Sequence, residues 1–376
     1  MSKFNQYAFI CASNPSECLS CYRAVLESTL KNILLIRPSA LGDVARSVPV
    51  LAAVRRAHPK AEIHWLVEQG FEDIIAYHPM LTSVVSFPKK AIKAAARYLD
   101  PRPLLAFRRT LRSSSYDCVL DLQGLARSAA MAYATAAPLR VGLANARELG
   151  WLGYTHRAKT DPGMHTVDRM LAIAAYIGIP PVHDMRLYTP PAAQEWISNA
   201  TWAKGDYVLI APTSRWPGKQ WPIERFTQVV DWLRRAEVGV VVVAGRGERE
   251  QCQSLLDRFS NDGGVTDLVG TTNIGQLMAC IERSRLVIAN DSAALHIAVG
   301  YDRPLIALFG PTRLSRVGPY QRHNEVLQHT TPEDVMNHKL ISSAALMQRI
   351  TTDEVIGRLQ TVLARGARYA ERQPYQ

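Results

Sequence analysis

The sequence predicts an α/β protein with two doubly wound parallel sheets, one in each half of the chain. Short apolar runs alternate with segments whose apolar residues recur at helical spacing, and this order occurs in both halves. Alternating strands and helices imply right-handed crossovers and parallel strands. A chain of 376 residues, 47% of them hydrophobic, can bury two cores. We therefore expect two domains that face a central cleft, with ligands bound beyond the carboxyl ends of the strands.

The elements of each half follow from these patterns. In the first half we predict strands at 32–37, 61–67, 83–87, 117–122 and 140–143, and helices at 43–57, 69–77, 124–136 and 165–177. In the second half we predict strands at 207–211, 238–244, 267–269 and 286–289, and a further strand that begins at Pro304. The helices predicted there lie at 223–236, 248–259 and 292–299, and another begins at Ile274. The box Thr351-x-x-Glu354 predicts the start of a final helix.

Domain boundaries are indicated by the proline-rich stretch from Gly178 to Pro191, which has no clear period and resembles a linker. This interpretation divides the chain into five parts. They are an N-terminal extension at 1–30, a first domain at 31–180, a linker at 181–192, a second domain at 193–345, and a C-terminal helical segment at 346–376 that could pack back on the first domain.

The net charge of +11 indicates an acidic partner. Basic residues concentrate between Lys89 and Arg112, where Asp100 is the only acid and apolar residues are interspersed. Such a segment is typical of one that rests on an anionic membrane face or binds a lipid headgroup, and it is equally compatible with an ordinary solvated helical face. No nucleic-acid-binding motif accompanies it, so we do not expect nucleic acid as a partner.

The six cysteines do not form a paired metal-binding set. Cys18-x-x-Cys21, with Cys11 before it, is at most half a metal site, and free thiols are the commoner outcome. No apolar run approaches the ~18 residues of a membrane span. The N-terminus lacks the features of a signal peptide. The composition therefore predicts a soluble cytoplasmic protein.

The run Leu286-Val-Ile-Ala-Asn-Asp291-Ser292 reads as a buried strand, a sharp turn and a helix start. The first N–H groups of a helix have no internal partner and carry a partial positive charge, which suits a diphosphate. The alternative is that Asp291 or Ser292 only caps the helix.

Two other loops follow predicted strands and carry polar residues. In the first, Gly42-Asp43 could be a turn with a helix cap, or Asp43 could face the cleft as a general base. The second loop contains Thr213, Ser214 and Lys219, which suit phosphate binding or a charged surface loop. Neither the G-x-G-x-x-G fingerprint nor a G-x-x-x-x-G-K-[ST] loop occurs, which argues against nicotinamide oxidoreductases and P-loop kinases.

Together these motifs resemble one family, the ADP-heptose:lipopolysaccharide heptosyltransferases of glycosyltransferase family 9. The resemblance covers about residues 31–320, in the family's order. It rests on Leu34-Leu-Ile-Arg-Pro-Ser-Ala-Leu-Gly-Asp43-Val, Asp121-Leu-Gln-Gly-Leu125, Thr213-Ser214 with Lys219-x-Trp221-Pro222, Asn290-Asp291-Ser292-x-x-x-His296, and Phe309-Gly-Pro-Thr312. The run His64-Trp-Leu-Val-Glu-Gln-Gly-Phe71 is more similar to the heptosyltransferase I branch than to the II branch.

The resemblance implies a GT-B fold with two Rossmann-like domains, an inverting mechanism and no required metal or cofactor. It implies that Asp43 deprotonates the acceptor hydroxyl and that Lys219 stabilises the departing ADP. The implied donor-binding residues are Thr213, Ser214, Glu248 (with Glu250 as a competing candidate), Asp291, Ser292, Ala293 and His296. The implied acceptor-binding residues are Gly42, Gln123, Arg127 and Arg97. Ala293 stands where the family usually has glycine, and one extra residue separates Ser214 from Lys219.

The first hypothesis is therefore a monomeric, peripheral enzyme at the cytoplasmic face of the inner membrane. It would move heptose from ADP-L-glycero-D-manno-heptose to Kdo-lipid A in lipopolysaccharide inner-core synthesis. A second hypothesis keeps the enzyme class and changes a substrate: a heptosyltransferase II-like step, a protein acceptor or another nucleotide sugar. A third is a catalytically silent relative that binds a lipopolysaccharide precursor. The presence of both Asp43 and Lys219 favours an active enzyme.

Overall fold

The computed structural model describes residues 30–365, which form two compact units that divide between Tyr188 and Thr189. The boundary falls inside the stretch expected to be a linker, and residues 179–190 contain no helix or strand. The N-terminal extension with Cys11, Cys18 and Cys21 lies outside the described residues. Within residues 30–365, no helix combines the length and the hydropathy needed to cross a bilayer.

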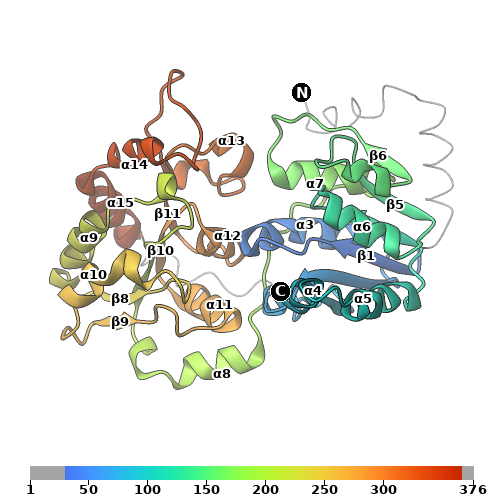
Figure 1. Ribbon diagram of the computed structural model, residues 1–376. Coiled ribbons are helices and arrows are strands. Elements are labelled where there is room, and N and C mark those ends of the chain that lie inside the picture. The colour runs from blue at the N-terminus through green and yellow to red at the C-terminus, as the bar shows by residue number, and fades with distance from the viewer. Residues whose placement is uncertain (1–29, 366–376) are drawn as a thin grey trace. The chain divides into compact units, whose positions relative to one another are not determined.

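The first unit contains a six-stranded sheet in which every neighbouring pair is parallel (Figure 1). The strands run in the order β3-β2-β1-β4-β5-β6. Their bounds are β1 Asn32–Ile36, β2 Glu62–Glu68, β3 Ser83–Phe87, β4 Cys118–Asp121, β5 Leu139–Leu143 and β6 His156–Ala158. The direction of strand progression reverses between β1 and β4, so the loops after these two strands form the switch point where ligands of doubly wound sheets bind.

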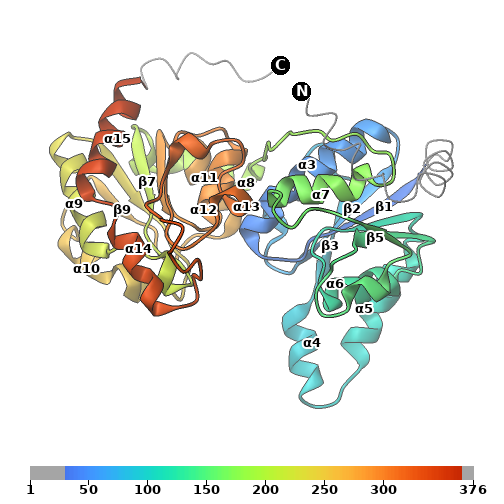
Figure 2. The same ribbon diagram turned by 90° about the horizontal axis from the view of Figure 1, so that it is seen from above.

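Helices cover both faces of this sheet (Figure 2). Their bounds are α3 Leu41–Ala57, α4 Lys89–Ala96, α5 Arg102–Ser113, α6 Ala126–Ala134 and α7 Thr166–Ala175. Helices α3 and α7 pack against each other. On the other face, residues of α5 and α6 share a buried cluster with Leu34 and Ile36 of β1. Because side chains alternate along a strand, Ile33 and Leu35 are buried on the face of α3 and α7.

The second unit repeats this plan with the order β12-β11-β10-β7-β8-β9, again with parallel neighbours. The strand bounds are β7 Tyr207–Ala211, β8 Gly239–Val242, β9 Val265–Asp267, β10 Leu286–Asn290, β11 Leu305–Leu308 and β12 Val326–Leu327. The helix bounds are α8 Pro191–Asn199, α9 Ile223–Arg235, α10 Gln253–Arg258, α11 Ile274–Arg283, α12 Ala293–Gly300, α13 Leu314–Val317, α14 Ala345–Gln348 and α15 Thr352–Arg365. Here the switch point lies between β7 and β10.

The prediction of two doubly wound parallel sheets is confirmed, and several elements differ. The helix expected at 69–77 is only a 3-10 turn, η2 (Glu72–Ile74). The basic segment forms two helices, because Leu99 takes a left-handed conformation and Pro101 follows it. Strands β6 and β12 were missed because three-residue and two-residue edge strands leave no periodic signal.

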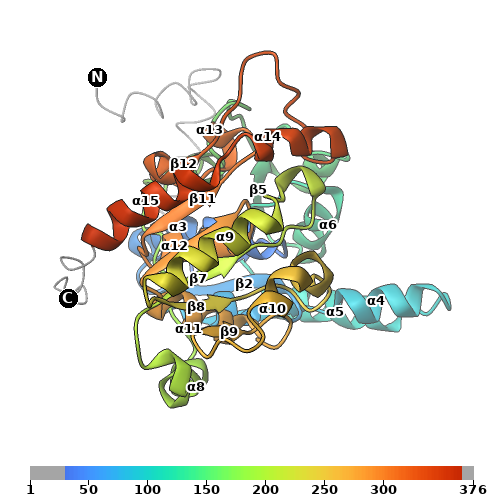
Figure 3. The same ribbon diagram turned by 90° about the vertical axis from the view of Figure 1, so that its left-hand side faces the viewer.

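The last helix, α15, begins at the predicted capping box. The backbone N–H of Thr351 donates to Glu354 Oε2 at 2.8 Å, and the N–H of Glu354 donates to Thr351 Oγ1 at 3.2 Å. The helix runs beside α9 (Figure 3), and its Val355 and Leu359 are buried in the core of the second unit. The apolar face of α15 therefore helps to complete the second core. The expectation that the C-terminal segment also packs back on the first domain stays a prediction. Residues 366–376 lie outside the described part of the chain.

Candidate functional site

In the first unit, Asp43 lies in the first turn of α3, directly after the loop that leaves β1. Its carboxylate forms ion pairs with Arg37, at 2.9 Å, and with Arg46. Arg37 also donates from Nη1 to the carbonyl oxygen of Leu122 at 2.5 Å. This contact joins the loop after β1 to the loop after β4. Arg37 therefore links Asp43 to both sides of the switch point.

The two arginines decide the protonation state of Asp43. Burial alone would raise the pKa of this carboxyl, but the guanidinium groups of Arg37 and Arg46 and a backbone hydrogen bond from Ala40 outweigh it. They hold the pKa of Asp43 well below its usual range, so the group is ionised at neutral pH. Two cations around one anion leave an excess of positive charge, which suits an anionic group on a ligand.

The neighbouring loop is fixed by a buried carboxylate, Asp121, at the end of β4. It accepts hydrogen bonds from the backbone N–H of Gln123 at 2.8 Å and of Gly124 at 3.2 Å, and from the hydroxyl of Tyr154 at 2.6 Å. Burial raises the pKa of Asp121 despite these bonds. Gln123 in turn donates from Nε2 to the carbonyl oxygen of Ser39 at 3.1 Å. Asp121 therefore acts as a support that places Gln123 against the Asp43 loop.

The four residues expected to contact the acceptor fall in two places. Gly42 is buried in α3 beside Asp43, and Gln123 lies across the switch point with its Oε1 buried and without a partner. Arg127 is exposed in the first turn of α6, with its guanidinium 6.0 Å from the ring centre of Phe87. Arg97 lies at the far end of α4. The structure thus groups Gly42 and Gln123 around Asp43, whereas Arg97 lies at the C-terminal end of α4.

In the second unit, Lys219 and Asp291 form an ion pair with Nζ 2.6 Å from Oδ2. Asp291 follows β10, and Lys219 ends the 3-10 turn η5 (Pro217–Lys219) in the loop after β7. Ser292 is the N-cap of α12 but makes no side-chain cap bond, and its Oγ is buried without a partner. The start of α12 therefore keeps N–H groups that no side chain caps, which favours an anion site over the simple capping alternative.

Asn290 holds the ends of the loop that carries Lys219. Its Nδ2 donates to the carbonyl oxygen of Pro212 at 2.6 Å, and its Oδ1 accepts from the backbone N–H of Trp221 at 3.2 Å. The side chain is fully buried. One side-chain amide therefore fixes both ends of this loop, at Pro212 and at Trp221. The sequence analysis assigned no role to Asn290, although it belongs to the Asn290-Asp291-Ser292 motif.

The two hydroxyls expected to bind the diphosphate are already engaged or flanked by polar partners. Thr213 donates from Oγ1 to Glu248 Oε2 at 2.7 Å, and Glu248 also accepts from the N–H of Gly245 at 3.0 Å. The N–H of Ser214 donates to Gln251 Oε1 at 3.2 Å. Glu250 is exposed and makes none of these contacts. Because a hydroxyl has one proton, Thr213 could donate to a phosphate only if it released Glu248.

A third loop joins this group of residues from the end of β11. A side chain on Gly310 would meet the carbonyl oxygen of Gly218 at 2.8 Å, so this loop touches the turn that carries Lys219. Thr312, two residues further on, has a buried hydroxyl without a hydrogen-bond partner. Ala293 begins α12, and His296 is buried within it. Thr312 was missed as a site residue, although it ends the Phe309-Gly-Pro-Thr312 motif.

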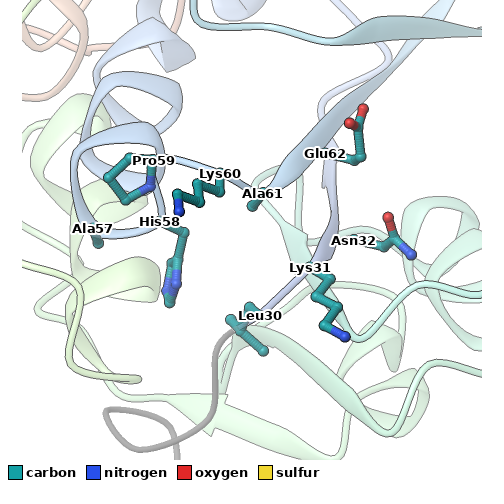
Figure 4. Close-up of a pocket in the computed structure, with 9 residues that line it drawn as sticks. All are labelled: Leu30, Lys31, Asn32, Ala57, His58, Pro59, Lys60, Ala61 and Glu62. Carbon is teal, nitrogen blue, oxygen red and sulfur yellow. The ribbon is translucent and has the colours of Figure 1, made fainter.

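A cavity of about 610 Å³ lies elsewhere in the first unit (Figure 4). Its lining includes Lys31 just before β1, Glu62 at the start of β2, and His58 and Lys60 after α3. These are the amino ends of parallel strands, whereas ligands of such sheets bind at the carboxyl ends. Burial lowers the pKa of His58. We therefore assign the candidate site to the two switch points.

No group of three or more histidine, cysteine, aspartate or glutamate side chains within residues 30–365 is arranged to hold a metal ion. Cys118, Cys252 and Cys280 are buried thiols. Burial raises the pKa of each of them, which makes them poor nucleophiles.

Comparisons with known proteins identify relatives of this chain and similar folds. A family model described as "Glycosyltransferase family 9 (heptosyltransferase)" matches residues 104–357. Lipopolysaccharide heptosyltransferase 1 of Escherichia coli K12 is 24% identical over 329 residues, which cover 85% of this chain and 99% of the relative. A glycosyl transferase family 9 structure from Veillonella parvula superposes with a TM-score of 0.78 at 23% identity, covering 90% of this chain and 98% of the other. The E. coli heptosyltransferase WaaC with ADP gives a TM-score of 0.71 at 22% identity, covering 88% and 99%.

The two hydrogen bonds by which Asn290 holds the ends of its loop, here called the Asn290 clamp, predict a loss of stability when they are removed. Asn290→Ala would leave the carbonyl of Pro212 and the N–H of Trp221 buried and unpaired, so we expect the free energy of unfolding to fall by about 2–4 kcal/mol. Urea unfolding followed by tryptophan fluorescence measures this. The matched control is Asn273→Ala, which removes an exposed helix cap and should cost about 1 kcal/mol. Equal losses in the two variants would contradict the clamp.

Proposed function

The chain belongs to glycosyltransferase family 9, the heptosyltransferase family, and we propose that it transfers heptose from ADP-heptose to a lipopolysaccharide core acceptor. The observation that carries the proposal is the polar site at the switch point of the second sheet. It contains the Lys219–Asp291 pair and the uncapped start of α12 with the unpartnered hydroxyl of Ser292. Thr312, whose hydroxyl also has no partner, follows Gly310 in the loop that touches the turn of Lys219. Backbone N–H groups at a helix start, a cation and free hydroxyls are the groups that bind a diphosphate.

The donor would bind through its diphosphate at this site. Lys219 has three N–H donors, and its pairing with Asp291 leaves the others for phosphate oxygens. Glu248 would accept from the ribose hydroxyls, which would release Thr213 to donate to the phosphate. Relatives include a heptosyltransferase structure described with ADP, which supports an adenosine diphosphate leaving group.

The transfer itself needs a base for the acceptor and charge stabilisation for the leaving group. The acceptor oxygen attacks the anomeric carbon, its proton passes to Asp43, and the bond from that carbon to the ADP oxygen breaks. Attack opposite the leaving group inverts the anomeric centre. Negative charge then grows on the departing ADP, where Lys219 and the positive end of α12 stabilise it. In this proposal Lys219 takes the place that a metal ion has in many nucleotide-sugar enzymes, so the reaction would not need one.

The proposed acceptor is Kdo-lipid A, reached at the cytoplasmic face of the inner membrane. Its carboxylate and phosphate groups match the excess positive charge of Arg37 and Arg46 around Asp43. The Nε of Arg37 is buried without a hydrogen-bond partner, so this cluster retains a donor. The alternatives are a core acceptor that already carries heptose, as in a heptosyltransferase II-like step, and a protein acceptor.

The acceptor assignment predicts the outcome of a direct transfer assay. With radiolabelled ADP-heptose, label should move to Kdo-lipid A and not to Kdo-lipid A that already carries a heptose, nor to protein. Transfer in the presence of excess EDTA should be unchanged, because no step uses a metal. Preferential labelling of the heptosylated acceptor would replace the proposed step with the II-like one. An absence of transfer to every acceptor, with ADP-heptose still bound, would indicate a silent relative.

The surroundings of Asp43 predict a pH effect as well as a loss of rate. Asp43→Asn should lower kcat by about 10²–10⁴-fold, the range for a positioned base, with ADP affinity unchanged. A base works only when ionised, and Arg46 helps to hold the pKa of Asp43 low. Arg46→Gln should therefore raise that pKa and move the acidic limb of the kcat profile to higher pH. Arg56→Gln, an exposed change on the same helix, is the control. An unmoved limb in Arg46→Gln would show that another group limits the reaction.

A further inference from the structure

Helices α4 and α5 form a hairpin that projects from the body of the first unit (Figures 2 and 3). Residues 97–101 connect the two helices at the far end. Helix α4 has no buried residue, and α5 buries only Phe107 and Leu111. Most of the hairpin surface is therefore not used to stabilise the fold and is available to a partner.

The base of the hairpin is held firmly. The ring of Phe107 packs on Phe87 at the end of β3, with 5.2 Å between ring centres. Lys89, the first residue of α4, forms an ion pair with Glu68 at the end of β2 at 2.8 Å. The hairpin thus keeps a defined attachment to the carboxyl edge of the first sheet, where Asp43 lies.

The tip of the hairpin carries apolar side chains that nothing in the first unit covers. Tyr98 is 85% exposed and Leu99 is 91% exposed, and Leu104 and Leu105 on α5 are also exposed. A leucine and a tyrosine at the extreme end of a projecting element have no packing role. Tyrosine is enriched at membrane–water interfaces, because its ring is apolar and its hydroxyl is polar.

Positive charge flanks this apolar tip and continues along both helices of the hairpin. The exposed cations of the hairpin are Lys90, Lys93, Arg97, Arg102, Arg108, Arg109 and Arg112. The only acid, Asp100, is paired with Arg102 at 2.9 Å. At helical spacing, Arg109 lies opposite the buried Phe107 and Leu111 and Arg112 lies to the side of them, and both are exposed. A polyanionic surface with an apolar interior complements such a hairpin.

We propose that the α4–α5 hairpin docks on an anionic phospholipid bilayer, with Tyr98 and Leu99 entering the interface and the surrounding cations contacting lipid phosphates. Charge alone would also suit a nucleic acid, but a nucleic acid gains nothing from an exposed leucine tip. The proposal deepens the proposed function, because it names the surface that would hold the enzyme where a lipid-linked acceptor lies. It rests on that function only for the identity of the acceptor.

Co-sedimentation with vesicles tests the docking surface. The full chain should bind phosphatidylcholine vesicles that contain phosphatidylglycerol, and should bind pure phosphatidylcholine weakly. The double change Tyr98→Ser/Leu99→Ser should lower partitioning by about tenfold or more, since it removes the inserted apolar area. Arg108→Gln/Arg109→Gln should lower it by about fivefold for each charge removed. The matched control is Leu152→Ser, which removes a leucine that is 61% exposed outside the hairpin and should change nothing.

Three outcomes would overturn the proposal: no binding of wild type to anionic vesicles, equal binding by the tip variant, or an equal loss in Leu152→Ser. Displacement of the protein from vesicles by a DNA oligonucleotide, together with an unaffected tip variant, would assign the hairpin to nucleic acid instead. Transfer to a lipid-free Kdo acceptor separates this test from the proposed function. The tip variant should retain that activity, and a wild type that binds vesicles without any transfer would refute the function while supporting the docking surface.

Discussion

The ion pair between Lys219 and Asp291 is the interaction on which the rest of the second unit's site depends. It joins the loop after β7 to the start of α12, which are the two sides of the switch point. Asn290 fixes the same loop from the neighbouring position of β10. A buried aspartate at a helix start would otherwise neutralise the charge that attracts an anion. Lys219 offsets that charge, and the uncapped N–H groups of α12 remain available.

At the switch point of the first unit the charges are reversed, because a carboxylate is the central group and cations surround it. There an acid, Asp43, is surrounded by Arg37 and Arg46, which keep it ionised. A strongly depressed pKa also makes a carboxylate a weaker proton acceptor, so the arginines favour the correct charge state at the expense of basicity. An anionic acceptor that drew the guanidinium groups toward itself would raise the pKa of Asp43. The same arginines would then contribute both to binding and to the timing of proton transfer.

Much of the fold could be predicted from the sequence, because short apolar runs indicate buried parallel strands. The central strands, the capping box at Thr351 and the loops with Asp43, Lys219 and Asp291 were all predicted, since each depends on local pattern. The tertiary contacts were not. Arg46 stands three residues after Asp43 in the sequence, but it is one of several arginines on or beside α3, and only the structure shows that its side chain is the one in contact with Asp43 from this helix. Likewise, the sequence cannot show that Asn290 reaches two backbone groups some 70 to 80 residues earlier in the chain.

The most direct test of the second unit's role is the affinity for ADP, measured by titration calorimetry in wild type, Lys219→Ala and Lys219→Ala/Asp291→Asn. Removal of Lys219 alone leaves a buried, unpaired carboxylate beside the diphosphate, so affinity should fall by at least about tenfold. Neutralising Asp291 in the double variant should restore part of it, which also separates electrostatics from misfolding. Equal ADP affinity in wild type and Lys219→Ala would contradict the account, because the diphosphate would then bind elsewhere.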